Sequence, residues 1–236
     1  MNTSFLEYKN QPAIFPSLIC ADLCNLETSV KALERLEYKT LHLDIIDGYF
    51  SPSMPLGMEI IHKLRKKTNM AFDVHLMVKE LDFFLNELLS VPVDQLCFHV
   101  ETSFHSDLYL NRIREKGTRA GLALTPGTPL SSLEYLAKKC DFILLMLINP
   151  GFAGHKSENQ VPYALQKIRD LRAFLDKKGL SIPIEVDGRI SCENIPTFFE
   201  AGANIFVAGT TCLFKDGDII EGTKNIRKMI KNINYN

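Results

Sequence analysis

The sequence predicts a single (β/α)8 barrel, or TIM barrel, and three observations carry that prediction. Eight short apolar runs rich in β-forming residues recur along the chain. Segments with helical spacing of apolar residues lie between these runs, so that strand and helix alternate throughout, as in parallel sheets covered by helices. The chain has 236 residues, and parallel barrels commonly take roughly 200–250 residues as one domain. We therefore expect one barrel domain over residues 1–236.

The expected elements follow one another in regular order. The eight strands are AIFPSLI (13–19), TLHLDII (40–46), AFDVHLMV (71–78), QLCFHVE (95–101), RAGLALT (119–125), FILLMLIN (142–149), IPIEVDG (182–188) and IFVAGT (205–210). Helical spacing is clearest in segments 23–37, 58–67, 81–89 and 161–178. Ser191 is a candidate helix N-cap, and Gly117, Gly179 and Gly202 follow helical stretches, where a C-terminal glycine is favoured.

Composition and charge exclude several classes of protein. Hydrophobic residues make up 46% of the chain and charged residues 23%, which is ordinary for a globular protein with a large core. The 27 basic and 28 acidic residues give a net charge of -1, so no bulk field would draw the chain to nucleic acid or an anionic membrane. The start, MNTSFLEYKNQP, has neither a basic beginning nor an apolar stretch. We expect a cytoplasmic protein that binds any anionic ligand locally.

Two further features receive a structural interpretation. The basic cluster HKLRKK (62–67) is interpreted as the solvated face of an amphipathic helix rather than as a phosphate site. The six cysteines form no CxxC pair and are interpreted as buried thiols. These are Cys20, Cys24, Cys97, Cys140, Cys192 and Cys212.

Titratable side chains gather at the ends of the expected strands, where a (β/α)8 barrel forms its active-site mouth. They occur in four strands, and several should face the barrel interior together. The set is His42, Asp44 and Asp47, then Asp73 and His75, then His99 and Glu101, and finally Glu185 and Asp187.

The two-residue period of a strand suggests a metal site among these residues. It places His42 and Asp44 on one side, pointing into the barrel, and it does the same for Asp73 and His75. Imidazoles and carboxylates on facing strands make a mixed nitrogen and oxygen ligand set suited to Zn²⁺, Mn²⁺, Fe²⁺ or Co²⁺. Together with Asp44 and Asp187, His42 and His75 are predicted to hold one divalent metal ion.

A second constellation is rich in glycine and comes from the last three strand ends. It consists of NPGFAG (149–154), DGR (187–189) and AGT (208–210). Such loops offer backbone N–H groups without bulky side chains, and in these barrels phosphate often binds after strands seven and eight. Three converging loops predict a phosphate cradle.

At these residues the sequence resembles the ribulose-phosphate 3-epimerase family over essentially its whole length. Seven blocks in the corresponding barrel positions carry the resemblance: PSLICADL, HLDIIDGYFSP, DVHLMV, FHVE, NPGFAG, EVDG and VAGT. The resemblance implies a metal-dependent isomerase of sugar-phosphate metabolism, with ribulose 5-phosphate and xylulose 5-phosphate as substrate and product. It further implies that the metal is held by His42, Asp44, His75 and Asp187, and that the two aspartates exchange protons with opposite faces of the substrate.

The resemblance also implies a set of substrate contacts. Ser17 and His75 would contact the sugar, and the phosphate would lie against the glycine-rich loops. The loop residues are Gly151, Phe152, Ala153, Gly154, Gly188, Gly209 and Thr210.

Departures from the family pattern concentrate around the substrate. The family usually has methionine, histidine, asparagine, glutamine, glycine and serine at the positions of Ile46, Tyr49, Ser53, His155, Arg189 and Thr210. The FAG and GTTCLF segments are more similar to an allulose-6-phosphate 3-epimerase branch. Because a guanidinium can bind phosphate bidentately, we expect Arg189 to contact the phosphate and to bias the enzyme towards a longer ketose phosphate.

Alternative functions remain at this point. Barrels that decarboxylate or perform aldol chemistry with a DxKxxD lysine are disfavoured, because HLDIIDG replaces that pattern. A barrel that only binds a sugar phosphate is disfavoured by the presence of both acid/base aspartates. The apolar helix faces suit either packing on the barrel or a homo-oligomer.

Overall fold

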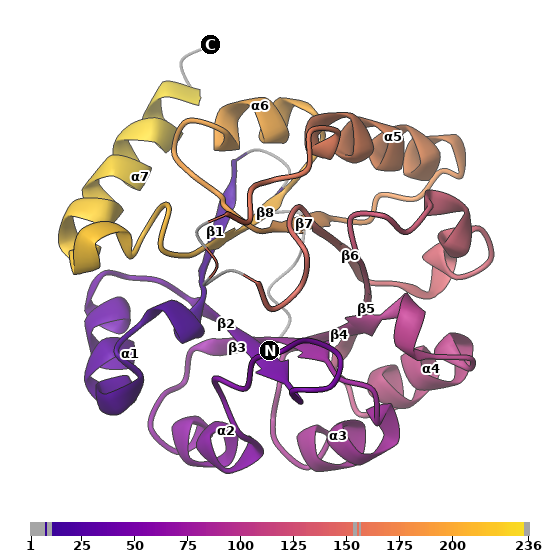
Figure 1. Ribbon diagram of the computed structural model, residues 1–236, viewed down its shortest axis with the longest axis horizontal. Helices are drawn as coiled ribbons and strands as arrows, with labels where there is room; N and C mark the ends of the chain where they lie inside the picture. The colour runs from indigo at the N-terminus through magenta and orange to yellow at the C-terminus, as the bar shows by residue number, and fades with distance from the viewer. Residues whose placement is uncertain (1–7, 9–10, 153–154, 156, 234–236) are drawn as a thin grey trace.

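The computed structural model describes residue 8, residues 11–152, residue 155 and residues 157–233. Within these residues, eight parallel strands form a barrel and the helices lie in a ring outside it, which confirms the predicted (β/α)8 fold (Figure 1). Neighbouring strands pair in the order β1-β8-β7-β6-β5-β4-β3-β2. Ser17, directly after β1, bridges to His42 in β2 and brings the two ends of the sheet together.

The elements match the expected alternation closely. The strands are β1 (Ala13–Pro16), β2 (Thr40–Ile46), β3 (Ala71–Met77), β4 (Gln95–His99), β5 (Arg119–Leu124), β6 (Phe142–Met146), β7 (Ile184–Asp187) and β8 (Ile205–Ala208). The α-helices of the described residues are α1 (Leu26–Arg35), α2 (Met58–Arg65), α3 (Leu81–Leu88), α4 (Ser106–Glu115), α5 (Ala164–Lys177), α6 (Ile195–Glu200) and α7 (Ile219–Ile233).

Some boundaries differ from the sequence-based expectation. The segment expected as a helix from residue 23 begins as a 3-10 helix, η3 (Leu23–Asn25), because the Asp22 carboxylate accepts a hydrogen bond from the Cys24 amide at 3.0 Å. Ser191 lies at the start of a turn before α6, whose N-cap residue is Asn194. The connection between β5 and β6 contains two 3-10 helices, η5 (Leu130–Leu133) and η6 (Ala137–Lys139).

Strand alternation sorts the side chains of β2 between two environments. Leu41, Leu43 and Ile45 are almost completely buried and belong to the main core between sheet and helices. His42 and Asp44 occupy the alternate positions and are buried inside the barrel. The register of β2 against β3 places His42 beside Asp73 and Asp44 beside His75, so four polar side chains share one side of the interior.

The other side of the barrel interior is apolar. It is filled by a separate buried cluster from β4, β5 and β6 and the residues after β6. Its members are Cys97, Ala123, Phe142, Leu144, Met146 and Ile148. A β-carbon on Gly121 would lie 2.6 Å from the Phe142 ring, so glycine at this position of β5 makes room for that ring. The apolar filling leaves the polar groups on the side formed by β2, β3, β7 and the two ends of β4, Gln95 and His99.

The cysteine interpretation is only partly correct. Cys97, Cys140 and Cys212 are buried, but Cys20 and Cys192 are partly exposed and Cys24 is exposed. Cys24 lies in η3, a short 3-10 helix in which no residue is buried.

Other surface features agree with the sequence. The basic side chains Lys63, Lys66 and Lys67 are exposed on and directly after α2, as expected of a solvated face. Gly117 and Gly179 adopt positive φ values of 79° and 67° at helix ends, where a side chain would be strained. None of the helices in the described part of the chain is both long and apolar enough to cross a membrane.

Candidate active site

A cavity of about 350 Å³ opens at the carboxyl ends of the strands. Ser17 after β1, Asp44 in β2, Asp187 in β7 and the segments 188–190 and 209–211 contribute to its wall. A larger surface groove of about 840 Å³ lies beside α6 and α7. The smaller cavity is the candidate active site because Asp44 and Asp187, the two aspartates predicted to be catalytic, both line it.

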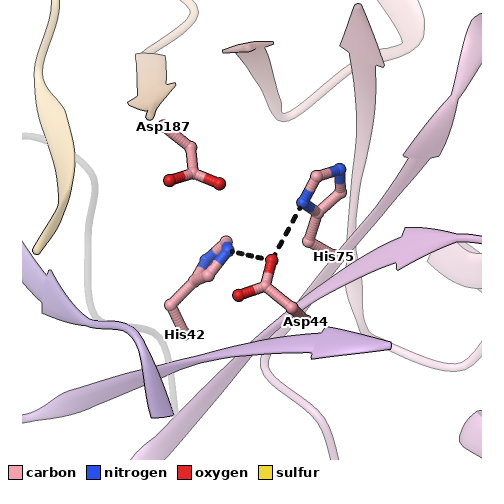
Figure 2. Close-up of side chains that lie close together, drawn as sticks. All are labelled: His42, Asp44, His75 and Asp187. Atoms are coloured by element: carbon pink, nitrogen blue, oxygen red, sulfur yellow. Dashed lines mark hydrogen bonds and ion pairs between the residues drawn. The ribbon is translucent and has the colours of Figure 1, made fainter. Parts of the chain in front are cut away.

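Four of these side chains form one group at the mouth of the barrel (Figure 2). One potential ligand atom from each residue lies within 4.8 Å of those of the other three. The Oδ1 atom of Asp44 lies 3.2 Å from Nε2 of His42 and 3.3 Å from Nδ1 of His75. Asp187 faces them from β7. We call His42, Asp44, His75 and Asp187 the mouth cluster.

A second polar group lies deeper in the barrel and holds His42 from behind. Nδ1 of His42 lies 2.6 Å from Oδ2 of Asp73 and 3.3 Å from Oε1 of Glu185. The Gln95 amide donates to Oδ1 of Asp73 at 2.8 Å and lies 3.4 Å from Oε2 of Glu185. We call Asp73, Gln95 and Glu185 the inner cluster; it was not assigned a role from the sequence, although Asp73 and Glu185 were counted among the strand-end residues.

One oxygen of the inner cluster receives no hydrogen bond. Oε1 of Glu185 is buried without a hydrogen-bond partner, although it lies near Nδ1 of His42. The two observations agree if the single Nδ1 proton of His42 is directed to Asp73, the closer carboxylate. Burial, and then the charge of Asp73, raise the pKa of Glu185 well above its ordinary value, so this carboxyl binds a proton more readily than an exposed glutamate does.

The two aspartates of the mouth cluster have opposite electrostatic environments. Burial alone would raise the pKa of Asp44, but the charges and hydrogen bonds of His42 and His75 outweigh it and lower that pKa. Burial, followed by repulsion from Asp44, raises the pKa of Asp187 to about 6. Burial would lower the pKa of His42, yet the carboxylates of Asp44 and Asp73 raise it well above its ordinary value. The mouth cluster thus pairs an ionised carboxylate with one able to carry a proton near neutral pH.

His75 is held by a different chain of groups. Its Nε2 atom lies 2.9 Å from Nε2 of His99, and Nδ1 of His99 lies 3.1 Å from Oε2 of Glu101. The second Glu101 oxygen accepts a hydrogen bond from the Thr125 amide at 2.8 Å and another from the Thr128 hydroxyl. Burial lowers the pKa of His99 to about 4, so His99 is neutral. The sequence placed His99 and Glu101 at a strand end without indicating this contact.

Asp47 does not join the mouth cluster. Its carboxylate accepts hydrogen bonds from the main-chain amides of Tyr49, Phe50 and Lys79 at 2.7–2.8 Å. Asp47 therefore stabilises the loop after β2 instead of facing the cavity with Asp44. The strand period could not reveal this, because β2 ends at Ile46.

The expected glycine-rich loops border the cavity. Gly151, Gly188 and Gly209 all line it, together with Thr210. Gly188 has a φ of 115°, and a β-carbon there would lie 2.9 Å from the Ile148 amide nitrogen. Gly151 has a φ of 80°, and its β-carbon would collide with the Ser51 side chain. Side chains are thus excluded at both positions, which leaves the backbone close to any ligand.

The remaining predicted contacts vary in position. Ser17 is buried and donates from its hydroxyl to Oδ2 of Asp44 at 3.1 Å. Phe152 is partly buried beside the cavity loop, with its ring 5.1 Å from that of His155. Ala153 and Gly154 lie outside the described residues. Arg189 has a φ of 54°, and its guanidinium donates to the main-chain carbonyls of residues 155 and 158.

Comparison with known proteins connects this geometry to a family of enzymes. Residues 13–213 match the model of the ribulose-phosphate 3 epimerase family. The chain is 38% identical over 216 residues to the ribulose-phosphate 3-epimerase of Synechocystis sp., which covers 91% of this chain and 92% of that protein. It is 36% identical over 198 residues to the ribulose-phosphate 3-epimerase of Bacillus subtilis, which covers 84% of this chain and 90% of that protein.

Solved structures of more distant proteins share the fold. KGPDC from Streptococcus mutans superposes with a TM-score of 0.74 at 11% identity, covering 94% of this chain and 98% of that chain. Thiamine phosphate pyrophosphorylase from Pyrococcus furiosus gives a TM-score of 0.63 at 15% identity, covering 95% and 98%. At these identities the likeness concerns the barrel alone.

Proposed function

The chain belongs to the ribulose-phosphate 3-epimerase family, and from this premise we propose that it converts ribulose 5-phosphate to xylulose 5-phosphate by epimerisation at C3. The observation that carries the proposal is the mouth cluster, in which carboxylates from two separate strands meet two imidazoles. Inversion at carbon requires one group to remove a proton from one face and another to return a proton to the opposite face. Asp44 from β2 and Asp187 from β7 are the proposed pair.

The donor set of the mouth cluster fits one divalent metal ion. Two imidazole nitrogens and two carboxylate oxygens within 4.8 Å of one another suit Zn²⁺, Mn²⁺, Fe²⁺ or Co²⁺. His42, Asp44, His75 and Asp187 would hold the ion, which would supply Lewis-acid stabilisation of the negative charge that develops on the substrate oxygens. Because ligation needs neutral imidazoles, the raised pKa of His42 makes metal binding weaker as the pH falls.

The proton-transfer roles follow from the positions and charges of the two aspartates. The two histidines lower the pKa of Asp44, and burial raises that of Asp187 to about 6, so Asp187 binds a proton more readily than Asp44 does. The roles exchange when the reaction runs in the opposite direction. Ser17 donates to Asp44 and fixes the orientation of that carboxylate from the side of β1.

The phosphate of the substrate would bind at the glycine-rich side of the cavity. Gly188 and Gly209 present backbone atoms there, and the Thr210 hydroxyl adds a side-chain donor. Gly151 and Phe152 belong to the adjoining loop after β6. Phosphate contacts are also proposed for the next two residues of the sequence, Ala153 and Gly154. The cytoplasmic location and a homo-oligomeric state stay predictions from the sequence.

A longer ketose phosphate, such as allulose 6-phosphate, is the second candidate substrate. The cavity wall includes Ile46 and Ser53, two positions at which the sequence departs from the family pattern. These side chains change the shape of the sugar end without removing either proposed acid/base aspartate. The chemistry of the site is therefore the same for both candidates, and only the length of the substrate differs.

Solvent deuterium uptake tests the proposal directly. Pentulose, hexulose and heptulose phosphates would be incubated with the metal-analysed enzyme in deuterated water, and incorporation at C3 would be followed together with epimer formation. We expect uptake with ribulose 5-phosphate. A higher kcat/KM for a hexulose phosphate would favour the second candidate. Absence of uptake with every sugar, in protein carrying metal, would leave a barrel that binds sugar phosphates without catalysis.

A further inference from the structure

Arg189 occupies an unusual backbone position directly after the loop glycine Gly188. Its φ is 54°, in the left-handed region that glycine adopts most readily, and Gly188 before it has a φ of 115°. The turn directs the guanidinium at the loop between β6 and α5. Nε donates to the carbonyl of Glu158 at 3.0 Å and one Nη atom donates to the carbonyl of His155 at 2.7 Å. The guanidinium thus bonds to the loop at two residues.

Further hydrogen bonds fix both partners of this contact. The Gln160 amide donates to the carbonyls of Gly188 and Arg189 at 2.8 and 3.1 Å, and the Asn194 amide donates to the same Arg189 carbonyl at 3.0 Å. The main chain of Arg189 is therefore held from two sides. Because the main chain of Arg189 is fixed, its side chain can hold the bonded loop in one position.

The loop itself is tied at its two ends. One Glu158 oxygen accepts from the main-chain amide of Asn149 at 2.7 Å and from its side-chain amide at 2.9 Å. Gly151, which lines the cavity, lies two residues after Asn149. A displacement of Glu158 would thus be transmitted to the part of the loop that borders the ligand space.

We propose that Arg189 is a positioning residue that holds the β6–α5 loop against the β7–α6 turn and thereby sets the spacing of the phosphate cradle. The proposal rests on the proposed function for its catalytic consequences. The guanidinium affects phosphate binding indirectly, because its hydrogen bonds to the His155 and Glu158 carbonyls fix the position of the loop. It makes no direct contact with the phosphate. This role differs from the direct contact between Arg189 and the phosphate that the sequence predicts.

Substitutions at Arg189 separate the two mechanisms. R189K keeps the positive charge but loses the planar fork that reaches two carbonyls, and R189G suits the positive φ and preserves the fold. The matched control is R172K, because Arg172 donates to the carbonyls of Ile182 and Leu180, both at 3.0 Å, in the loop between α5 and β7. That loop lies outside the cavity wall.

Two readouts would be measured on full-length protein. Hydrogen–deuterium exchange reports whether the amides of the described loop residues, 149–152, 155 and 157–160, become less protected, and this measurement does not require catalysis. KM for the best sugar phosphate and the inhibition constant of inorganic phosphate report the cradle. We expect R189K and R189G to speed exchange in this loop and to raise both constants about tenfold, with kcat within about twofold of the wild type. R172K should change neither readout.

Each contrary result has a defined meaning. Wild-type exchange and wild-type phosphate inhibition in R189K and R189G would show that Arg189 does not position the loop. Unchanged exchange with weakened phosphate binding in R189G, and recovery in R189K, would show direct pairing with the phosphate and overturn the proposal. Faster loop exchange in a protein inactive on every sugar would retain the positioning role while the proposed epimerase function failed.

Discussion

The two histidines of the mouth cluster are supported in different ways. His42 contacts Asp44 with Nε2 and is held at Nδ1 by Asp73, a carboxylate completely buried inside the barrel. His75 contacts Asp44 with Nδ1 and is held at Nε2 by the neutral imidazole of His99, behind which Glu101 reaches the surface. His42 is therefore held by a buried carboxylate, whereas His75 is held by a second imidazole that is itself bonded to a partly exposed carboxylate.

A histidine that binds a metal needs both a basic nitrogen and a fixed ring orientation, and the two histidines differ in which of these their neighbours provide. A carboxylate behind an imidazole fixes its tautomer and raises its basicity, which strengthens metal ligation. A neutral imidazole fixes orientation with a smaller effect on charge. We therefore expect the neighbouring charge to affect metal binding mainly at His42, and the position of the ring to matter more at His75. Substitutions of the ligands, of the two aspartates and of the groups behind each histidine should have successively smaller effects.

Removal of the metal or of both histidines should have the largest effect. Chelation of the divalent ion should abolish turnover, since the developing charge would lose its Lewis acid. H42A and H75A should each lower the metal content per chain, measured by elemental analysis, together with the activity. Full metal occupancy in the double variant would refute the proposed ligand set. Restored activity on adding Zn²⁺, Mn²⁺, Fe²⁺ or Co²⁺ to chelated wild type would identify the ion.

Substitution of the aspartates should follow in size. D44N and D187N should each lower kcat by at least ~10²-fold, the lower end of general acid–base contributions. Circular dichroism and thermal unfolding would check that each variant folds. Near wild-type turnover with normal metal content in either variant would show that the residue is not a catalytic base.

Asp73 tests the buried support of His42. D73N replaces the acceptor carboxylate by a neutral amide of the same shape, and metal affinity should fall about 10–100-fold, as is usual for such outer partners. E185Q is the matched control, because Glu185 lies farther from Nδ1 of His42, at 3.3 Å against 2.6 Å for Asp73, and burial raises the pKa of its carboxyl. Equal losses of metal affinity in the two variants, measured by competition with a chelator, would contradict the distinction between the carboxyls.

The strand pattern predicted much of this site. A period of two residues correctly assigned His42 and Asp44 to the barrel interior, because the helices cover only the opposite face of β2. The fold followed from repeated strand and helix signals that each depend on local sequence. The convergence of Asp187 with these residues followed from barrel closure, since strand ends meet at one mouth.

Contacts set by loops and by neighbouring strands were beyond the sequence pattern. The pattern counted His99 but gave no sign that its Nε2 atom meets His75, because that contact depends on the register of β3 and β4. Asp47 lies one residue past β2, where alternation no longer applies. The direction of the Arg189 side chain depends on two successive positive φ values, which the residue type itself disfavours.

Glu101 tests the solvent-facing support of His75, with the smallest expected effect. Burial alone would raise its pKa, but the His99 hydrogen bond and the charge that His99 gains once it is protonated below about pH 4, then Thr128 and Thr125, lower the pKa of Glu101 from 4.5 to about 2. A carboxyl whose folded-state pKa is depressed stabilises the fold above its unfolded-state pKa and loses this contribution as the pH falls through the folded value. The stabilisation should therefore be complete above about pH 4.5 and decline towards pH 2.

E101Q should accordingly lower the free energy of unfolding by about 1–2 kcal/mol at neutral pH, a value reduced because solvent screens a partly exposed carboxylate. Denaturant unfolding of wild type and variant between neutral pH and pH 2 would show the difference shrinking below about pH 4.5. E59Q is the control, because Glu59 forms an exposed ion pair with Lys63 and its substitution should change stability little. If the difference between wild type and E101Q stayed constant down to pH 2, the Glu101 charge would not support His99, and the contrast between the two histidines would then rest on Asp73 alone.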